Sequence, residues 1–164
     1  MTASPGRPPP ARLTVDPGRL WAGGAATAVV AALVALVGVL IGDAVLDLDM
    51  VEPPLLPIGD AFAVRYALTA ACLALAATAL AHLLAVTTPR PRAFFSWIVM
   101  LATLVGVVLP FAMDGTLGGK LATSFVNLVL GICILSLLSS VLRRTTRGPR
   151  PAPPGWAPDR GPYR

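Results

Sequence analysis

The stretch LATSFVNLVLGICILSLLSSVL, residues 121–142, contains no charged side chain and lies between Lys120 and Arg143. As a helix with a rise of about 1.5 Å per residue it would be about 33 Å long, enough to cross a hydrocarbon layer of about 30 Å. Its apolar residues are continuous, whereas a lipid-facing barrel strand alternates apolar and polar positions. The stretch therefore predicts a transmembrane helix.

Three more charge-free stretches precede it, and together they define the predicted spans as about 20–42, 66–88, 93–113 and 121–142. Of the 164 residues, 55% are hydrophobic and only 13% are charged, which is far from the composition of a soluble domain. Two cysteines are too few for a disulfide framework. We expect an all-α, integral membrane four-helix bundle over residues 20–142.

The positions of the basic residues predict the orientation of this bundle. If the N-terminus is cytoplasmic, all 13 basic residues except Arg65 and Lys120 lie on the cytoplasmic side. An excess of lysine and arginine in cytoplasmic segments is the general rule for membrane proteins. The sequence thus predicts a multi-pass protein of a bacterial cytoplasmic membrane with both termini inside.

The segments outside the spans are two tails and one long loop. Residues 1–19 and 143–164 are rich in proline and arginine and are expected to be disordered and close to anionic lipid headgroups. Because the arginines flank spans, nucleic acid is not an expected partner. The outside loop 43–61 is acidic, but it lacks the central glycine and the third oxygen ligand of a calcium loop, so no metal site is predicted.

The predicted spans contain no aspartate, glutamate, lysine or arginine. Ion-coupled exporters and channels with charged rings need such groups inside the membrane, so both classes are disfavoured. The single histidine, His82, is predicted on the cytoplasmic side, while most acidic residues are outside, so no serine triad can form. We therefore expect no enzyme, no catalytic residue and no cofactor.

One face of the last span carries its clearest polar pattern. Ser124, Asn127 and Gly131 are spaced so that they share a helix face. An amide in lipid is costly unless it forms hydrogen bonds, so Asn127 is expected to face the bundle. A hydrogen bond between helices is favoured over contact with a polar substrate.

Small residues predict two further packing positions. His82 continues an i, i+4 row formed by Ala70, Ala74 and Thr78, where another helix can approach closely and accept a hydrogen bond from the ring. Gly38 and Gly42 form a GxxxG pattern in the first span. Both patterns predict contacts between helices.

The order of these features resembles small four-span membrane proteins of unknown function from actinobacteria. The resemblance covers about residues 20–142 and rests on the alanine- and valine-rich first span, Leu56-Pro57-Ile58-Gly59, Thr88-Pro89-Arg90-Pro91-Arg92 and the polar Asn127. It implies the four-span topology and assigns no activity to any residue.

Two functional classes remain open. The first is a structural or accessory membrane protein, whose partners are the lipid bilayer and either a second copy of the chain or another membrane protein. The second is a small oligomeric carrier or pore for an apolar or weakly polar solute, which would use the faces that carry Asn127 and His82.

Overall fold

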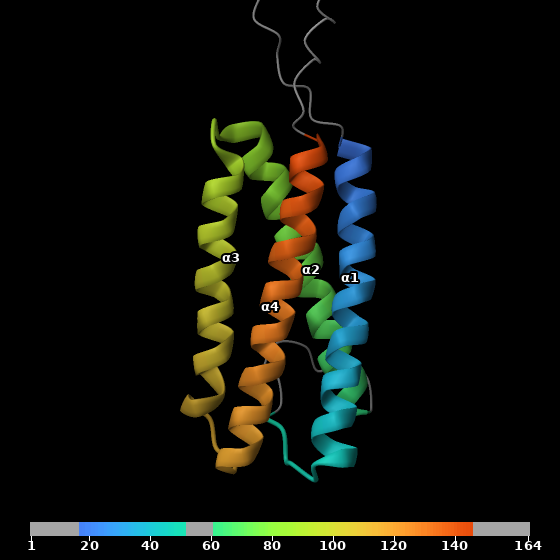
Figure 1. Ribbon diagram of the computed structural model, residues 1–164, viewed down its shortest axis with the longest axis vertical. Coiled ribbons are helices and arrows are strands. Elements are labelled where there is room, and N and C mark those ends of the chain that lie inside the picture. Colours follow the sequence, from blue (N-terminus) through green and yellow to red (C-terminus); the bar gives the residue numbers. More distant parts are fainter. Residues whose placement is uncertain (1–16, 52–60, 146–164) are drawn as a thin grey trace, which may run out of the picture.

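The computed structural model describes residues 17–51 and 61–145, and these form four long helices packed as a bundle (Figure 1). The long helices are α1 (Pro17–Leu40), α2 (Phe62–Thr87), α3 (Pro91–Val108) and α4 (Leu117–Thr145). A π-helix, Ile41–Val45, continues α1, and a 3₁₀-helix, Leu109–Ala112, continues α3. The four long segments are apolar and long enough to cross a membrane, so the predicted all-α four-helix architecture is confirmed.

The helices begin before the charge-free stretches and include the basic residue that precedes each of them: Arg19, Arg65, Arg92 and Lys120. Long basic side chains can extend along a helix to the polar interface, so a charge marks the edge of the hydrocarbon layer and not the end of the helix. Residues 17–19 and 143–145, which were predicted as parts of the tails, are therefore helical. The remainder of both tails and loop residues 52–60 lie outside the described residues.

Two prolines set the connection between α2 and α3. Thr88 is extended, with φ −122° and ψ 137°, as expected for a residue before proline. Pro91 then occupies the first turn of α3, where its missing N–H has no consequence. The turn between α2 and α3 is therefore short, and the two helices are antiparallel.

Helices α1 and α2 approach each other through small residues. Ala31, Ala35, Ala74 and Ala81 are fully buried, and a Cβ added at Gly24 would overlap the side chain of Thr78. Association inside a membrane depends on close van der Waals packing, which small residues allow. This interface explains why α1 and α2 form the most extensive pair of the bundle.

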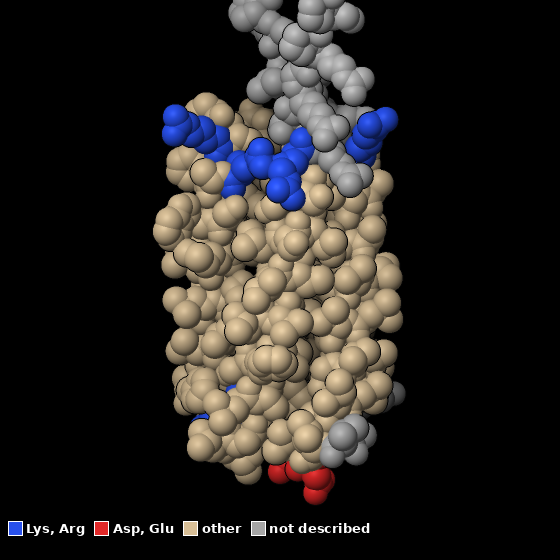
Figure 2. Space-filling view, in the orientation of Figure 1, with Lys and Arg blue, Asp and Glu red and all other residues tan. Residues whose placement is uncertain are grey.

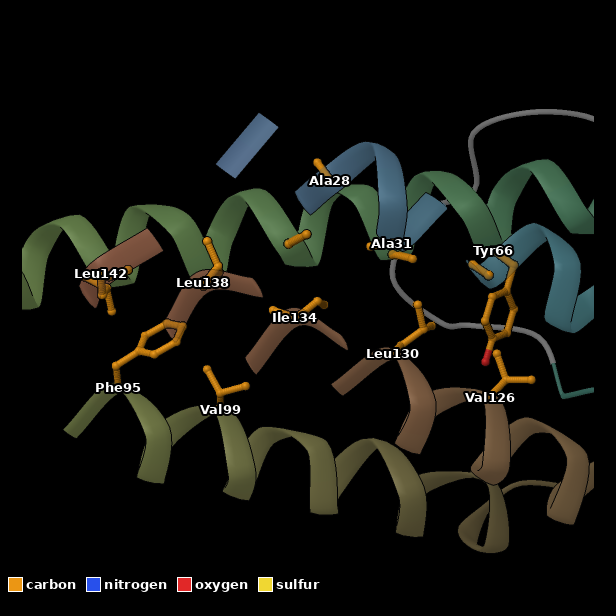
Figure 3. Close-up of a cluster of buried hydrophobic side chains, with 14 of the residues drawn as sticks. Ala28, Ala31, Tyr66, Phe95, Val99, Val126, Leu130, Ile134, Leu138 and Leu142 are labelled. Atoms are coloured by element: carbon orange, nitrogen blue, oxygen red, sulfur yellow. The ribbon is translucent and has the colours of Figure 1, made fainter. Parts of the chain in front are cut away.

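Helix α4 carries the larger core side chains and packs on both α1 and α3. One of its faces buries Val126, Leu130, Ile134, Leu138 and Leu142. Figure 3 shows Phe95 and Val99 of α3 directed at this face. They are the only buried residues of α3, so this helix offers the most side-chain surface to lipid.

Charged side chains gather at the two ends of the bundle (Figure 2). The basic end carries the exposed Arg19, Arg90, Arg92 and Arg143, and the acidic end carries the exposed Asp43, Asp47, Asp49 and Asp114. On the face that Figure 2 shows, the surface between them is almost entirely uncharged. The orientation prediction rests on this separation.

Replacing Gly24 tests the α1–α2 interface. We expect Gly24→Val to destabilise the protein by about 1–3 kcal/mol, because the added atoms overlap Thr78 in a packed core. Ala25→Val, at an exposed neighbouring position, should change the stability by no more than about 0.5 kcal/mol. Reversible unfolding in mixed micelles measures both values, and equal effects would contradict the packing role of Gly24.

Candidate functional site

Polar side chains of α4 bond to α2 and α3 in the half of the bundle nearer the acidic end. Asn127 Nδ2 donates to the Gly106 carbonyl at 2.7 Å, and Tyr66 Oη donates to Asn127 Oδ1 at 2.6 Å. Ser124 Oγ donates to the Val107 carbonyl at 2.7 Å. We call Tyr66, Ser124 and Asn127, with these two carbonyls, the Asn127 cluster. It joins three helices through hydrogen bonds.

Pro110, in the 3₁₀-helix that continues α3, lies three and four residues after the two carbonyls to which α4 donates. In an α-helix the N–H of residue 110 would bond to the carbonyl of Gly106, and in a 3₁₀-helix it would bond to that of Val107. A proline has no N–H, so neither carbonyl receives a bond from position 110. Asn127 and Ser124 supply donors to those same carbonyls from the neighbouring helix.

Tyr66 is held at the start of α2 with only 4% of its surface exposed. Its ring lies 5.9 Å from that of Phe62, one helical turn earlier. Figure 3 shows its hydroxyl directed at α4. Asn127 thus uses one of its two amide hydrogens for Gly106 and its oxygen for Tyr66, and the described residues accept no bond from its second amide hydrogen.

The predicted face of α4 lies against α3. Ser124 and Asn127 bond to the α3 backbone, and a Cβ added at Gly131 would overlap Thr103 of α3. The structure therefore brings Ser124, Asn127 and Gly131 together at one contact between helices.

The two glycines of the GxxxG pattern meet different neighbours. A Cβ added at Gly38 would lie 2.8 Å from Val126 of α4, so Gly38 is at a contact between helices. A Cβ at Gly42 would lie 2.6 Å from the Met50 sulfur, which belongs to the segment after the π-helix. The nearest neighbour of Gly42, which lies in the π-helix, is thus this segment.

His82 lies apart from the Asn127 cluster, in the half of α2 nearer the basic end. Ala70, Ala74 and Thr78 of its row are buried, while His82 itself is half-buried. Its Nδ1 is buried and has no hydrogen-bond partner among the described residues. The hydrogen bond predicted from the ring is thus not formed at this atom.

A cavity of about 370 Å³ lies between α2, α3 and α4, beside the Asn127 cluster. Tyr66, Thr103 and Asn127 line its polar end, and the remaining lining is almost entirely apolar. Leu130 and Ile134 of α4 are buried and line it too (Figure 3). None of the residues that line it is charged.

The described residues hold no group of three side chains suited to a metal ion, and their two cysteines are free. Glu52 and Asp60 of the acidic loop lie outside the described residues.

Sequence reasoning missed Tyr66, Gly106 and Pro110. A signal was present for two of them, because a proline inside a predicted span leaves the carbonyl four residues earlier without its usual donor. That relation points from Pro110 to Gly106. Nothing comparable points to Tyr66, whose position beside Arg65 is typical of an interfacial aromatic residue.

The comparisons with known proteins give a family and no activity. DUF6069, described as a family of unknown function, matches residues 15–148. No curated protein and no solved structure matches the chain.

Restoring the N–H at position 110 tests the origin of the Asn127 cluster. Asn127→Leu alone should destabilise the protein by about 1–2 kcal/mol, since two hydrogen bonds between helices are lost. In a Pro110→Ala background the new N–H can bond to Gly106, so the cost of Asn127→Leu should fall by about 0.5–1 kcal/mol.

The control for this double-mutant cycle is Leu128→Ala, at an exposed position of α4. Its effect on the free energy of unfolding should be the same with proline or alanine at position 110. An Asn127→Leu cost that does not change between the two backgrounds would contradict the proposed link.

Proposed function

The chain belongs to the DUF6069 family of unknown function, and we propose that this member is a non-catalytic structural or accessory protein of a bacterial cytoplasmic membrane. The four candidate spans support a multi-pass membrane protein. The proposed partners are the lipid bilayer and either a second copy of the chain or another membrane protein, with no nucleic acid.

The Asn127 cluster is the observation that carries this proposal. Its three side chains form hydrogen bonds with other helices of the same chain. Six threonine hydroxyls of the helices donate to carbonyls of their own helix, those of Thr27, Thr69, Thr78, Thr87, Thr103 and Thr123. The polar groups within the bundle therefore stabilise its architecture, which supports a structural role over a reactive one.

The exposed face of α3 supports a role in assembly or lipid contact. Trp97, Leu101, Leu104 and Val105 are each more than half exposed. In a bilayer this face meets lipid or the helix of a partner. Either contact suits a protein with a structural or accessory role.

We further propose that the basic end of the bundle is cytoplasmic, so that both termini are inside. The exposed arginines of that end and the aspartates of the other end support this orientation.

The cavity favours a second candidate function, a small oligomeric carrier or pore for an apolar or weakly polar solute. Its lining has the required polarity, with apolar walls and one polar end. Because it lies between helices of one chain, a path across the membrane would need further copies.

Cysteine labelling tests the orientation. In a background in which Cys72 and Cys133 are replaced by alanine, Asp114→Cys should react with a membrane-impermeant maleimide on intact cells. Thr88→Cys, in the α2–α3 turn, should react only after the cells are lysed. The opposite pattern would reverse the proposed orientation.

Purification from native membranes, followed by intact-complex mass measurement and reconstitution into vesicles, tests the function. We expect an assembly of fixed stoichiometry and no flux of small neutral solutes. A homo-oligomer whose solute flux is abolished by Asn127→Leu, but not by Leu128→Ala, would favour the carrier and overturn the accessory role.

A further inference from the structure

The cavity beside the Asn127 cluster is elongated along the bundle. Its lining extends from Tyr66 to Leu80 on α2 and from Ile98 of α3 to Leu109 of the 3₁₀-helix that continues α3. At about 1.5 Å per residue, these stretches are about 21 Å and about 16 Å long. The cavity is therefore a narrow slot parallel to the helices, which we call the α2–α3 slot.

The α2–α3 slot opens toward the lipid-facing surface. Leu73 of α2 is 50% exposed and Ile98 of α3 is 41% exposed, and both line it. Helix α2 packs mainly on α1, whereas α3 packs mainly on α4. Figure 1 shows α2 and α3 adjacent at their turn and farther apart toward the acidic end, where α2 lies near α1. A ligand would thus enter sideways from the bilayer.

The volume of about 370 Å³ limits the size of a ligand. A cavity of about 150 Å³ holds a benzene-sized molecule, and pockets for organic ligands start at about 300 Å³. The narrow shape and this volume suit one hydrocarbon chain that lies along the membrane normal.

The polar end of the slot specifies a neutral hydrogen-bond acceptor. Asn127 lines the slot and keeps one amide hydrogen for which the described residues provide no acceptor. No charged side chain lines the slot, so an ionised headgroup would find no partner there. A carbonyl oxygen matches the remaining amide hydrogen.

We propose that the α2–α3 slot binds a neutral lipid with a single acyl chain, whose ester carbonyl accepts a hydrogen bond from Asn127 and whose chain lies between α2 and α3. The lipid comes from the leaflet at the acidic end, so that its chain points toward the basic end. This binding goes beyond the proposed function and holds for an accessory protein as well as for a carrier.

The hydrogen bond determines the selectivity of the slot. Surrounding lipid chains are as apolar as the slot, so hydrocarbon contact alone gives little preference for binding over the bilayer. One net hydrogen bond corresponds to a preference of about fivefold. A hydrocarbon without the carbonyl should lack this preference.

Photo-crosslinking of the full-length protein in lipid nanodiscs tests the proposal. The probe is monooleoylglycerol with a diazirine in its acyl chain, and adducts are located by peptide mass spectrometry. We expect adducts on the slot residues of α2 and α3. Unlabelled monooleoylglycerol should compete about fivefold better than octadecene.

A filled slot gives the matched comparison. Ala102→Phe places a ring in the slot from an exposed position of α3, whereas Ala93→Phe places the same ring on α3 outside the slot. The yield of adducts should fall about tenfold in Ala102→Phe and stay unchanged in Ala93→Phe. Ala77→Phe fills the slot from α2. It is used as the slot-filling variant if Ala102→Phe does not elute as the wild-type protein does.

Two results would overturn the proposal. One is an unchanged adduct yield in a slot-filling variant that elutes as the wild type does. The other is equal competition by octadecene and monooleoylglycerol in the wild-type protein, which requires no variant.

Discussion

A hydrocarbon environment supplies no water to a backbone carbonyl that has lost its donor, and this constraint governs the Asn127 cluster. Pro110, in the 3₁₀-helix that continues α3, has no N–H, so the Gly106 carbonyl loses its α-helical donor. Asn127 of α4 bonds to that carbonyl, and Ser124 bonds to the next one, that of Val107. The break in α3 and the polar residues of α4 are therefore parts of one arrangement, and Tyr66 joins it to α2.

The contacts between the helices also determine where the cavity lies. Polar bonds hold α4 to α3, small residues hold α1 to α2, and α4 also packs on α1. Helices α2 and α3 share a short turn and separate toward the acidic end. The cavity lies in this separation, with the Asn127 cluster at its polar end.

The number of spans and the shared face of Ser124, Asn127 and Gly131 could be predicted because both depend on spacing along one helix. The residues that contact this face could not be predicted, because they depend on how separate helices are placed relative to one another. Tyr66 illustrates the limit: its bond to Asn127 joins residues 61 positions apart. Gly42 illustrates another limit, since spacing along the first span did not indicate its nearest neighbour, Met50 of the segment after the π-helix.

The pairing of consecutive helices has a consequence for how the protein is made. Chains emerge from the ribosome N-terminus first, and contacts between neighbours in sequence form fastest. Helices α1 and α2 can bury Gly24 against Thr78 before α3 has been synthesised. Biogenesis then needs a later step, in which a second hairpin docks through α4 and completes the contact between α1 and α4.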